Sequence, residues 1–275
     1  MNKMKLIRIF AKNSLLTGRK PLWARMRRLL WAAALLLPAF AVRADVVFTN
    51  LYSFTGTNNG ANPQAALVQG SDGFFYGTTY GGGAYTNQYG VGCGTVFKIN
   101  TNGWLTSLYP FGSIQDTNGN PLDGGNPQAA LVQGSDGYFY GTTYSGGTNL
   151  WSGTVFKIST NGVLTTLYSF TGGNDGANPQ VALVQGSDGY FYGTTPTEGG
   201  PFGLHRGTVF KISTNGTLNT LYSSPGDYSG SSNGLFHGRD GNFYGSTSGL
   251  SYRCYFVGFL CYSGGAVFAI PPMAR

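Results

Sequence analysis

The sequence predicts an all-β fold, and within that class a β-propeller of four blades with four antiparallel strands each. Three observations support this prediction: glycine accounts for 45 of the 275 residues, charged residues for only 10%, and one unit recurs four times after the first 44 residues. Glycine-rich repeats built from short strand-like segments are typical of propellers and not of proteins made of long helices.

The repeated unit consists of two blocks in a fixed order. Copies of the first block occupy 62–79, 126–143, 178–195 and, in degenerate form, 233–247. Copies of the second block occupy 94–103, 153–162, 207–216 and, as a last variant, 265–270. Self-similarity of this kind identifies each unit as one structural repeat.

Each unit contains four segments with the composition of β-strands. In the first unit these are 64–70, 74–79, 95–99 and 104–111. Ser71-Asp72-Gly73 joins the first pair, because glycine accepts a positive φ and aspartate can bond the turn backbone. An Asn102-Gly103 turn joins the second pair. The segments are apolar on both faces, which suits blades that are covered on both sides.

The order of the strands predicts how the ring closes. The chain begins, after the first 45 residues, with a fourth-strand segment at 46–54 and ends with a third-strand segment at 265–270. Pairing of these two segments completes every blade and removes exposed strand edges. The alternatives are an open array and an eight-bladed ring made by two chains. With closure, 45–275 form one monomeric repeat domain, with blades at 64–111, 128–170, 180–223 and 233–270 plus 46–54.

Residues 1–44 have the pattern of a secretory signal peptide with an amino-terminal extension. A basic stretch over 25–28 precedes an apolar run over 29–42, and the segment ends at Ala44. The run of about 14 residues is shorter than the roughly 20 that span a bilayer. We expect cleavage after Ala44 and a secreted protein, extracellular or periplasmic, with no membrane span after cleavage. Met26 is a second candidate for the start of translation, and an uncleaved amphipathic anchor is the alternative.

Charge and cysteine content limit the partners and the cross-links. Ten of the 17 basic residues lie in 1–44, so seven face ten acidic residues in the remainder, a net charge of −3. No basic stripe is left to neutralise phosphates, and nucleic acid is not expected as a partner. In an oxidising compartment we expect Cys254 and Cys261 to form a disulfide, with Cys93 as the rival partner.

Three short blocks carry a resemblance to a known family. They are the run from Gly94 to Ile99, the Leu-Tyr-Ser-Phe sequence at 51–54 and 167–170, and the run from Gly70 to Thr79. These blocks resemble the GloVer tandem-repeat family of exported bacterial proteins, over 46–270. The resemblance implies a secreted or cell-surface repeat protein and assigns it no activity.

Loops that follow even-numbered strands share one face of a propeller, and here they differ between units and are rich in aromatic residues. We expect this face to bind a glycan or an extracellular protein, because aromatic rings stack on flat apolar surfaces while their polar tips stay hydrated. The alternative is that these rings pack the loops against the blades. The candidate binding residues are Tyr80, Tyr85, Tyr89, Tyr144, Trp151, Phe202, His205, Tyr252, Tyr255 and Tyr262.

Two sets of oxygen-bearing residues have the composition of a carboxylate or metal site. One aspartate recurs in each unit, always before a turn glycine, and is expected to form the turn: Asp72, Asp136, Asp188 and Asp240. Ca²⁺, the only cofactor that the sequence suggests, would be held by oxygens of Asp116, Asn118, Asn120 and Asp123. That segment lacks a bidentate Glu, which favours a solvated loop instead.

Few residues could support catalysis. Glu198, the only Glu in the chain, shares one loop with His205, and the remaining histidine is His237. Glycoside hydrolysis usually needs two acidic residues flanking the bond. The sequence therefore favours a non-enzymatic binding or structural module. The alternative is a carbohydrate-active enzyme, a glycoside hydrolase or lyase, that uses the same face.

Overall fold

The computed structural model describes residues 47–149, 151–196, 207–223, 229–249 and 266–271. Its contacts divide the chain into two compact units, Met1–Thr49 and Asn50–Arg275, and all of the strands lie in the second. The signal peptide predicted for 1–44 lies outside the described residues. Within the described ranges, no helix is long and apolar enough to cross a membrane.

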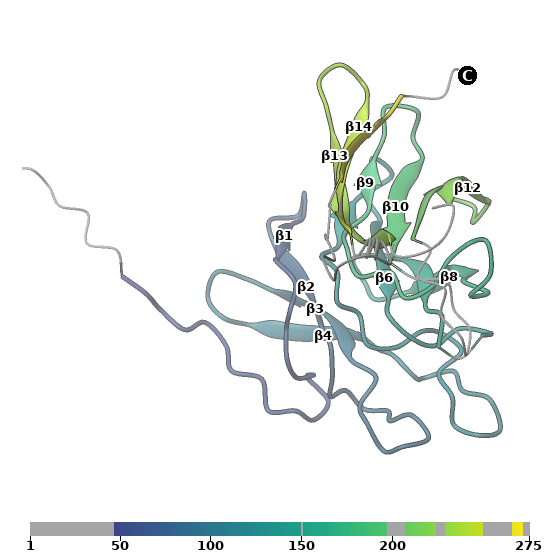
Figure 1. The fold of residues 1–275 in the computed structure, drawn as a ribbon. Helices are drawn as coiled ribbons and strands as arrows, with labels where there is room; N and C mark the ends of the chain where they lie inside the picture. The colour runs from purple at the N-terminus through teal and green to yellow at the C-terminus, as the bar shows by residue number, and fades with distance from the viewer. Residues whose placement is uncertain (1–46, 150, 197–206, 224–228, 250–265, 272–275) are drawn as a thin grey trace, which may run out of the picture. The chain divides into compact units, whose positions relative to one another are not determined.

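The second unit is all-β and consists of four antiparallel sheets, one per sequence repeat (Figure 1). In each sheet the strands follow one another in chain order. The first sheet holds β1 (Val68–Gln69), β2 (Phe75–Thr79), β3 (Thr95–Ile99) and β4 (Leu105–Pro110). The second holds β5 (Val132–Gln133), β6 (Phe139–Thr143), β7 (Thr154–Ile158) and β8 (Leu164–Ser169). The third holds β9 (Val184–Gln185), β10 (Phe191–Thr195), β11 (Thr208–Ile212) and β12 (Leu218–Ser223). The fourth holds β13 (Ser229–His237), β14 (Phe243–Gly249) and β15 (Ala266–Ile270).

The first strand of the repeat is shorter than the predicted 64–70. β1 pairs with β2 only through Val68 and Gln69. The reason lies just upstream, where Asn62 has a φ of 56° and Pro63 has no N–H to donate to a ladder. The chain then bends at Ala65 before it joins the sheet.

The recurring aspartates form turns, as predicted. The Asp72 carboxylate accepts the Phe74 N–H at 3.2 Å and the Tyr76 hydroxyl at 2.6 Å. Gly73 in the same turn has a φ of +85°, a backbone conformation that favours glycine. The tyrosine hydroxyl bonds recur in the other sheets, from Tyr140 to Asp136 at 2.6 Å, Tyr192 to Asp188 at 2.8 Å and Tyr244 to Asp240 at 2.5 Å.

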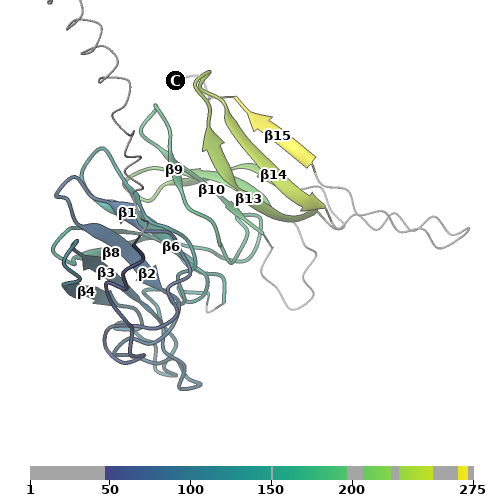
Figure 2. The same cartoon turned by 90° about the vertical axis from the view of Figure 1, so that its left-hand side faces the viewer.

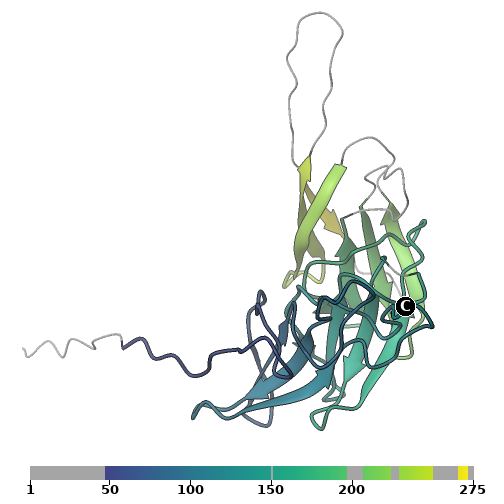
Figure 3. The ribbon, with the colours of Figure 1, turned by 90° about the horizontal axis from the view of Figure 1, so that it is seen from below.

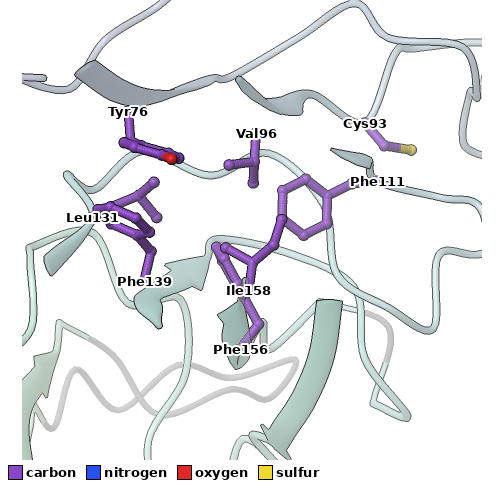
Figure 4. Close-up of a cluster of buried hydrophobic side chains, with 8 residues drawn as sticks. All are labelled: Tyr76, Cys93, Val96, Phe111, Leu131, Phe139, Phe156 and Ile158. Carbon is purple, nitrogen blue, oxygen red and sulfur yellow. The ribbon is translucent and has the colours of Figure 1, made fainter. Parts of the chain in front are cut away.

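Neighbouring sheets are joined by aromatic stacking. The rings of Tyr76 and Phe139 lie 3.9 Å apart at 24°, and the same geometry is repeated by Tyr140 with Phe191 and by Tyr192 with Phe243. Figure 4 shows the first of these joints, where Tyr76 and Val96 of the first unit face Leu131 and Phe139 of the second unit. Burial, and then the bond to the neighbouring aspartate, raises the pKa of each of the three tyrosines. All three hydroxyls therefore remain protonated donors at neutral pH.

Within the described residues, the two outermost sheets each leave one face partly exposed. Leu67 of the first unit is 50% exposed, whereas its counterpart Leu131 is 3% exposed. At the other end of the series Tyr244 is 37% exposed, whereas Tyr140 is fully buried. The residues that join neighbouring sheets are thus present on both end faces, where no described segment buries them as the next sheet does at the three joints.

Residues 50–54 pack like a fourth strand but form none (Figure 3). Phe54 meets Phe97 edge-on at 5.2 Å, as Phe111 meets Phe156. A Cβ on Gly103 would lie 2.5 Å from the Leu51 carbonyl oxygen, and one on Gly162 would lie 2.6 Å from that of Leu108. This segment therefore has the position against the first sheet that β4 has against the second.

The fourth sheet has three strands instead of four, with β15 at its edge (Figure 2). The described residues show no pairing of 47–54 with β15, so the predicted strand that would complete the last blade is not observed.

The stacked joints should dominate the stability of the second unit. We expect Tyr140→Ala to lower the free energy of unfolding by about 3–5 kcal/mol, because it removes a buried ring from between two sheets. Tyr140→Phe should cost about 1 kcal/mol, since it keeps the stack and loses one hydrogen bond. Urea denaturation measures both. The control Trp104→Ala removes a ring that is 77% exposed and should change the free energy of unfolding little. If Tyr140→Ala lowers that free energy no more than the control does, the stacked joints do not dominate stability.

Candidate functional site

The strand registers define two ends of each sheet. Thr79, Thr95 and Pro110 are aligned at one end of the first sheet, and Phe75, Ile99 and Leu105 at the other. Connections after even-numbered strands therefore leave from the first end, here named the loop face, and those after odd-numbered strands from the second, here named the turn face. The described loop face comprises 80–93, 111–125, 144–149, 151–152 and 171–177.

Asparagines tie the loops of neighbouring units together. The Asn126 side chain, at the start of the second unit, donates to the Tyr80 carbonyl at 2.9 Å, and its N–H donates to the Cys93 carbonyl at 2.7 Å. Asn178 repeats both bonds one unit later, to Tyr144 at 2.8 Å and Ser152 at 2.8 Å. Both asparagines have a positive φ and precede a proline. The repeated Asn-Pro dipeptide was the signal in the sequence that could have revealed these anchors.

A tight turn positions Tyr89 at the tip of the first loop. The Asn87 side-chain oxygen accepts the N–H groups of Tyr89 at 3.0 Å and Val91 at 3.1 Å. The Gln115 side chain, from the next loop of the same unit, donates to the Thr86 carbonyl at 2.8 Å. These hydrogen bonds therefore fix the conformation of the loop that carries Tyr89.

Tyr89 meets Trp151 across two units. Their rings are stacked with centroids 6.0 Å apart at 29°, and the side chains are 67% and 53% exposed. Trp151 belongs to a second turn, in which the Ser152 N–H donates to the Asn149 carbonyl at 2.9 Å and the Asn149 side chain bonds the Thr171 carbonyl. We name Tyr89 and Trp151 the aromatic platform. Large exposed hydrophobic side chains also occur at Tyr85 and Val91 on the loop of Tyr89 and at Ile114 on the next loop of that unit.

The other predicted binding residues fall into two groups. Tyr80 and Tyr144 are only half-exposed, and their carbonyls serve as acceptors for the asparagine anchors. Phe202, His205, Tyr252, Tyr255 and Tyr262 lie outside the described residues, as do Glu198, Cys254 and Cys261. His237 lies in β13, where its ring stacks on Phe243 at 4.6 Å. Of the predicted set, the described structure brings Tyr89 and Trp151 into ring contact.

Cys93 belongs to the core beneath the loop face. It is buried among Val96, Phe111 and their neighbours, and within the described residues it has no disulfide partner (Figure 4). Burial, and then the charge of Asp123, raises the pKa of its thiol to about 11. The thiol is therefore protonated at neutral pH and acts as a small apolar group.

The oxygens proposed for Ca²⁺ have separate roles in the loop. Asp123 is buried, and its carboxylate accepts five hydrogen bonds, from the N–H groups of 112–114 and the hydroxyls of Tyr109 and Ser113. Asp116 accepts bonds from the Asn120 side chain and from the N–H groups of Asn118 and Asn120, which lower its pKa. The described residues contain no cluster of three acidic, Cys or His side chains around a common point. The calcium site stays a prediction, and it would require a cation to displace these donors.

Asp123 has a counterpart in the next unit. Asp175 accepts the Tyr168 hydroxyl at 2.9 Å and the Thr171 N–H at 2.7 Å. Burial, and then the bond to Asp175, raises the pKa of Tyr168 to about 12. A buried carboxylate that receives a tyrosine hydroxyl and backbone N–H groups is thus a repeated means of folding the loop after the fourth strand.

We expect Asp123→Asn to lower the free energy of unfolding by about 1–3 kcal/mol, because an amide cannot accept all the bonds that the carboxylate accepts. Thermal melts in EDTA and in Ca²⁺ should show the same loss. A calcium-dependent rise in the melting temperature of the parent protein, abolished by Asp116→Asn, would instead support the cation site.

These features define a class: a tandem-repeat protein of four small sheets with variable aromatic loops on one face. The family model of the Gloeobacter/Verrucomicrobia repeat matches residues 39–259, and the chain belongs to that family. This confirms the family resemblance of the repeats. A search of the curated proteins finds none whose sequence matches this chain.

Solved structures with a similar arrangement include three enzymes. A luciferin-regenerating enzyme has 12% identity and a TM-score of 0.45, over 76% of this chain and 61% of its own. An ulvan lyase has 15% identity and a TM-score of 0.45, over 70% and 47%. The endo-arabinase of Bacteroides thetaiotaomicron has 11% identity and a TM-score of 0.41, over 79% and 78%. The chain spans less than two thirds of the length of the first two proteins, and likenesses of this size assign it no activity.

Proposed function

We propose that this chain is an exported, non-enzymatic binding module that holds a glycan on its loop face. The observation that carries the proposal is the aromatic platform, in which two rings from different units stack and still leave more than half of each side chain exposed. Export is supported by the order of residues over 25–44, where a basic stretch is followed by an apolar run and then by small residues.

A glycan suits this surface better than a flat protein partner. Sugar rings have apolar faces that pack on aromatic rings and hydroxyls that bond to polar groups at the rim. The rim here carries Gln88 and Gln115, whose amides both donate and accept hydrogen bonds. The site is small and lies on loop tips, which suits one or two sugar rings.

The described carboxylates favour binding over hydrolysis. Of Asp116, Asp123 and Asp175 on the loop face, only Asp116 is not buried, and the other two are occupied by hydrogen bonds. Hydrolysis of a glycosidic bond usually requires two acidic groups that reach the substrate.

The Trp151 ring should carry much of the affinity. We expect Trp151→Ala to weaken glycan binding by about thirtyfold or more, since buried aromatic anchors are typically worth about 2 kcal/mol or more. The assay is a glycan array with the exported protein, followed by calorimetry and by measurement of released reducing ends. Trp104→Ala removes an exposed Trp from the turn face and serves as the matched control. Equal affinity in the two variants, or release of reducing ends, would contradict the proposal.

We also propose that the four sheets close into a ring within one chain. The support is that three joints share one geometry and that both end faces carry the residues of that joint, with Tyr244 on one and Phe75 on the other. Closure would place the fourth-strand segment 46–54 beside β15, whose outer edge carries no partner in the described sheet.

Tyr244 tests this closure. In a closed ring Tyr244→Ala should cost about as much as Tyr140→Ala, about 3–5 kcal/mol, because both rings would be buried between sheets. In an open array the loss should be within about 1 kcal/mol, as for other partly exposed residues. Urea denaturation gives the free energies, and light scattering determines whether the closing partner is the same chain or a second one. A small loss in a monomer rules out the ring.

A further inference from the structure

The described basic residues all lie at the turn face, which also carries the turn aspartates. Lys98 and Lys157 are held at the turn face, where their ammonium groups donate to the Thr160 and Thr214 carbonyls at 3.1 and 3.2 Å. Lys211 lies 4.6 Å from the Tyr190 ring centre, and Arg239 lies in the turn between Gly238 and Gly241. Across the described part of the loop face there is no Lys or Arg at all.

The charge near the aromatic platform is negative. The turn from Asp116 to Asn120 lies beside the platform loop, because a Cβ on Gly119 would be 3.8 Å from the Cα of Gln88. Hydrogen bonds from Asn120 and the turn backbone lower the pKa of Asp116, so its carboxylate stays ionised through the neutral and mildly acidic range. An anionic ligand on the platform would be repelled by this charge and would find no described cation within the same loops.

The other exposed polar side chains near the platform are uncharged, and they can form hydrogen bonds with sugar hydroxyls. Thr86, Gln88 and Asn149 are exposed residues on the loops that carry the two platform rings. Gln115 is exposed on the adjacent loop, from which its side chain donates to the Thr86 carbonyl. Hydroxyl and amide groups can both donate and accept, as sugar hydroxyls do, whereas carboxylates and sulfates of a ligand offer acceptors only.

We propose that the aromatic platform selects uncharged glycans and discriminates against uronate-containing or sulfated ones. This inference rests on the proposed glycan-binding function and adds the chemical class of the ligand. Discrimination arises from the absence of a counter-charge on the described loops together with the ionised Asp116, while the stacking surface is shared by both classes of glycan.

The test compares matched oligosaccharides on the full exported chain. The neutral probes are hexamers of β-1,4-glucan, xylan and mannan, and the anionic probes are hexamers of polygalacturonate and alginate. We expect at least one neutral probe to bind, with an affinity that falls in Trp151→Ala, and every anionic probe to bind at least about tenfold more weakly. An anionic probe that binds best through Trp151 overturns the selectivity and leaves glycan binding intact. No Trp151-dependent binding of any probe overturns both proposals.

A charge substitution tests the cause of the discrimination. Gln88→Lys places a cation next to Tyr89 and should raise the affinity for polygalacturonate hexamer by about tenfold at low salt, an effect that 1 M salt should suppress. Asn102→Lys adds the same charge to the turn face and should leave that affinity unchanged. If Gln88→Lys gains nothing over Asn102→Lys, charge is not the discriminating feature and the inference is wrong.

Discussion

The structure depends on a stacked contact between a tyrosine of one sheet and a phenylalanine of the next. Each tyrosine ring lies flat on its partner at 3.9 Å, and its hydroxyl is held by the aspartate of its own hairpin turn. One short segment of sequence thus specifies a turn, fixes a ring and orients that ring toward the neighbouring unit. Because the contact is made between units, no repeat can bury its own aromatic surface alone.

The close approach of the sheets explains a glycine at the turn. A Cβ on Gly70 would lie 2.8 Å from the Tyr76 ring and 3.0 Å from the Phe139 ring, and Gly134 and Gly186 are in the same situation. A methyl group there would push the two rings apart. The glycine content of the chain therefore reflects the distance between sheets as well as the turns, and the requirement recurs at each of the three joints.

The sequence predicted the parts of the structure that depend on local signals. The strands from Thr95 to Ile99 and their counterparts, the Asp-Gly turns and the four-unit organisation follow from composition and spacing, and all are present. The predicted first strand was too long, because its length is set by the backbone at Asn62 and Pro63 and not by β-propensity. Asp123 resembled a calcium ligand in the sequence, and only the fold brings the Tyr109 hydroxyl and three N–H groups to its oxygens.

The candidate site was harder to predict because its residues do not repeat. Tyr89 and Trp151 occupy loops of different length in different units, and their contact depends on how Asn126 and Asn178 hold those loops against the sheets. The same asparagine anchors separate two requirements that usually compete in binding proteins, namely a stable fold and variable binding loops. Buried tyrosine, aspartate and asparagine bonds fix the loop bases in the first two units, so the tips can vary in sequence without weakening the joints between sheets. Selection for a ligand can therefore act on exposed rings and amides, while the repeated residues beneath them are constrained by stacking and by these hydrogen bonds.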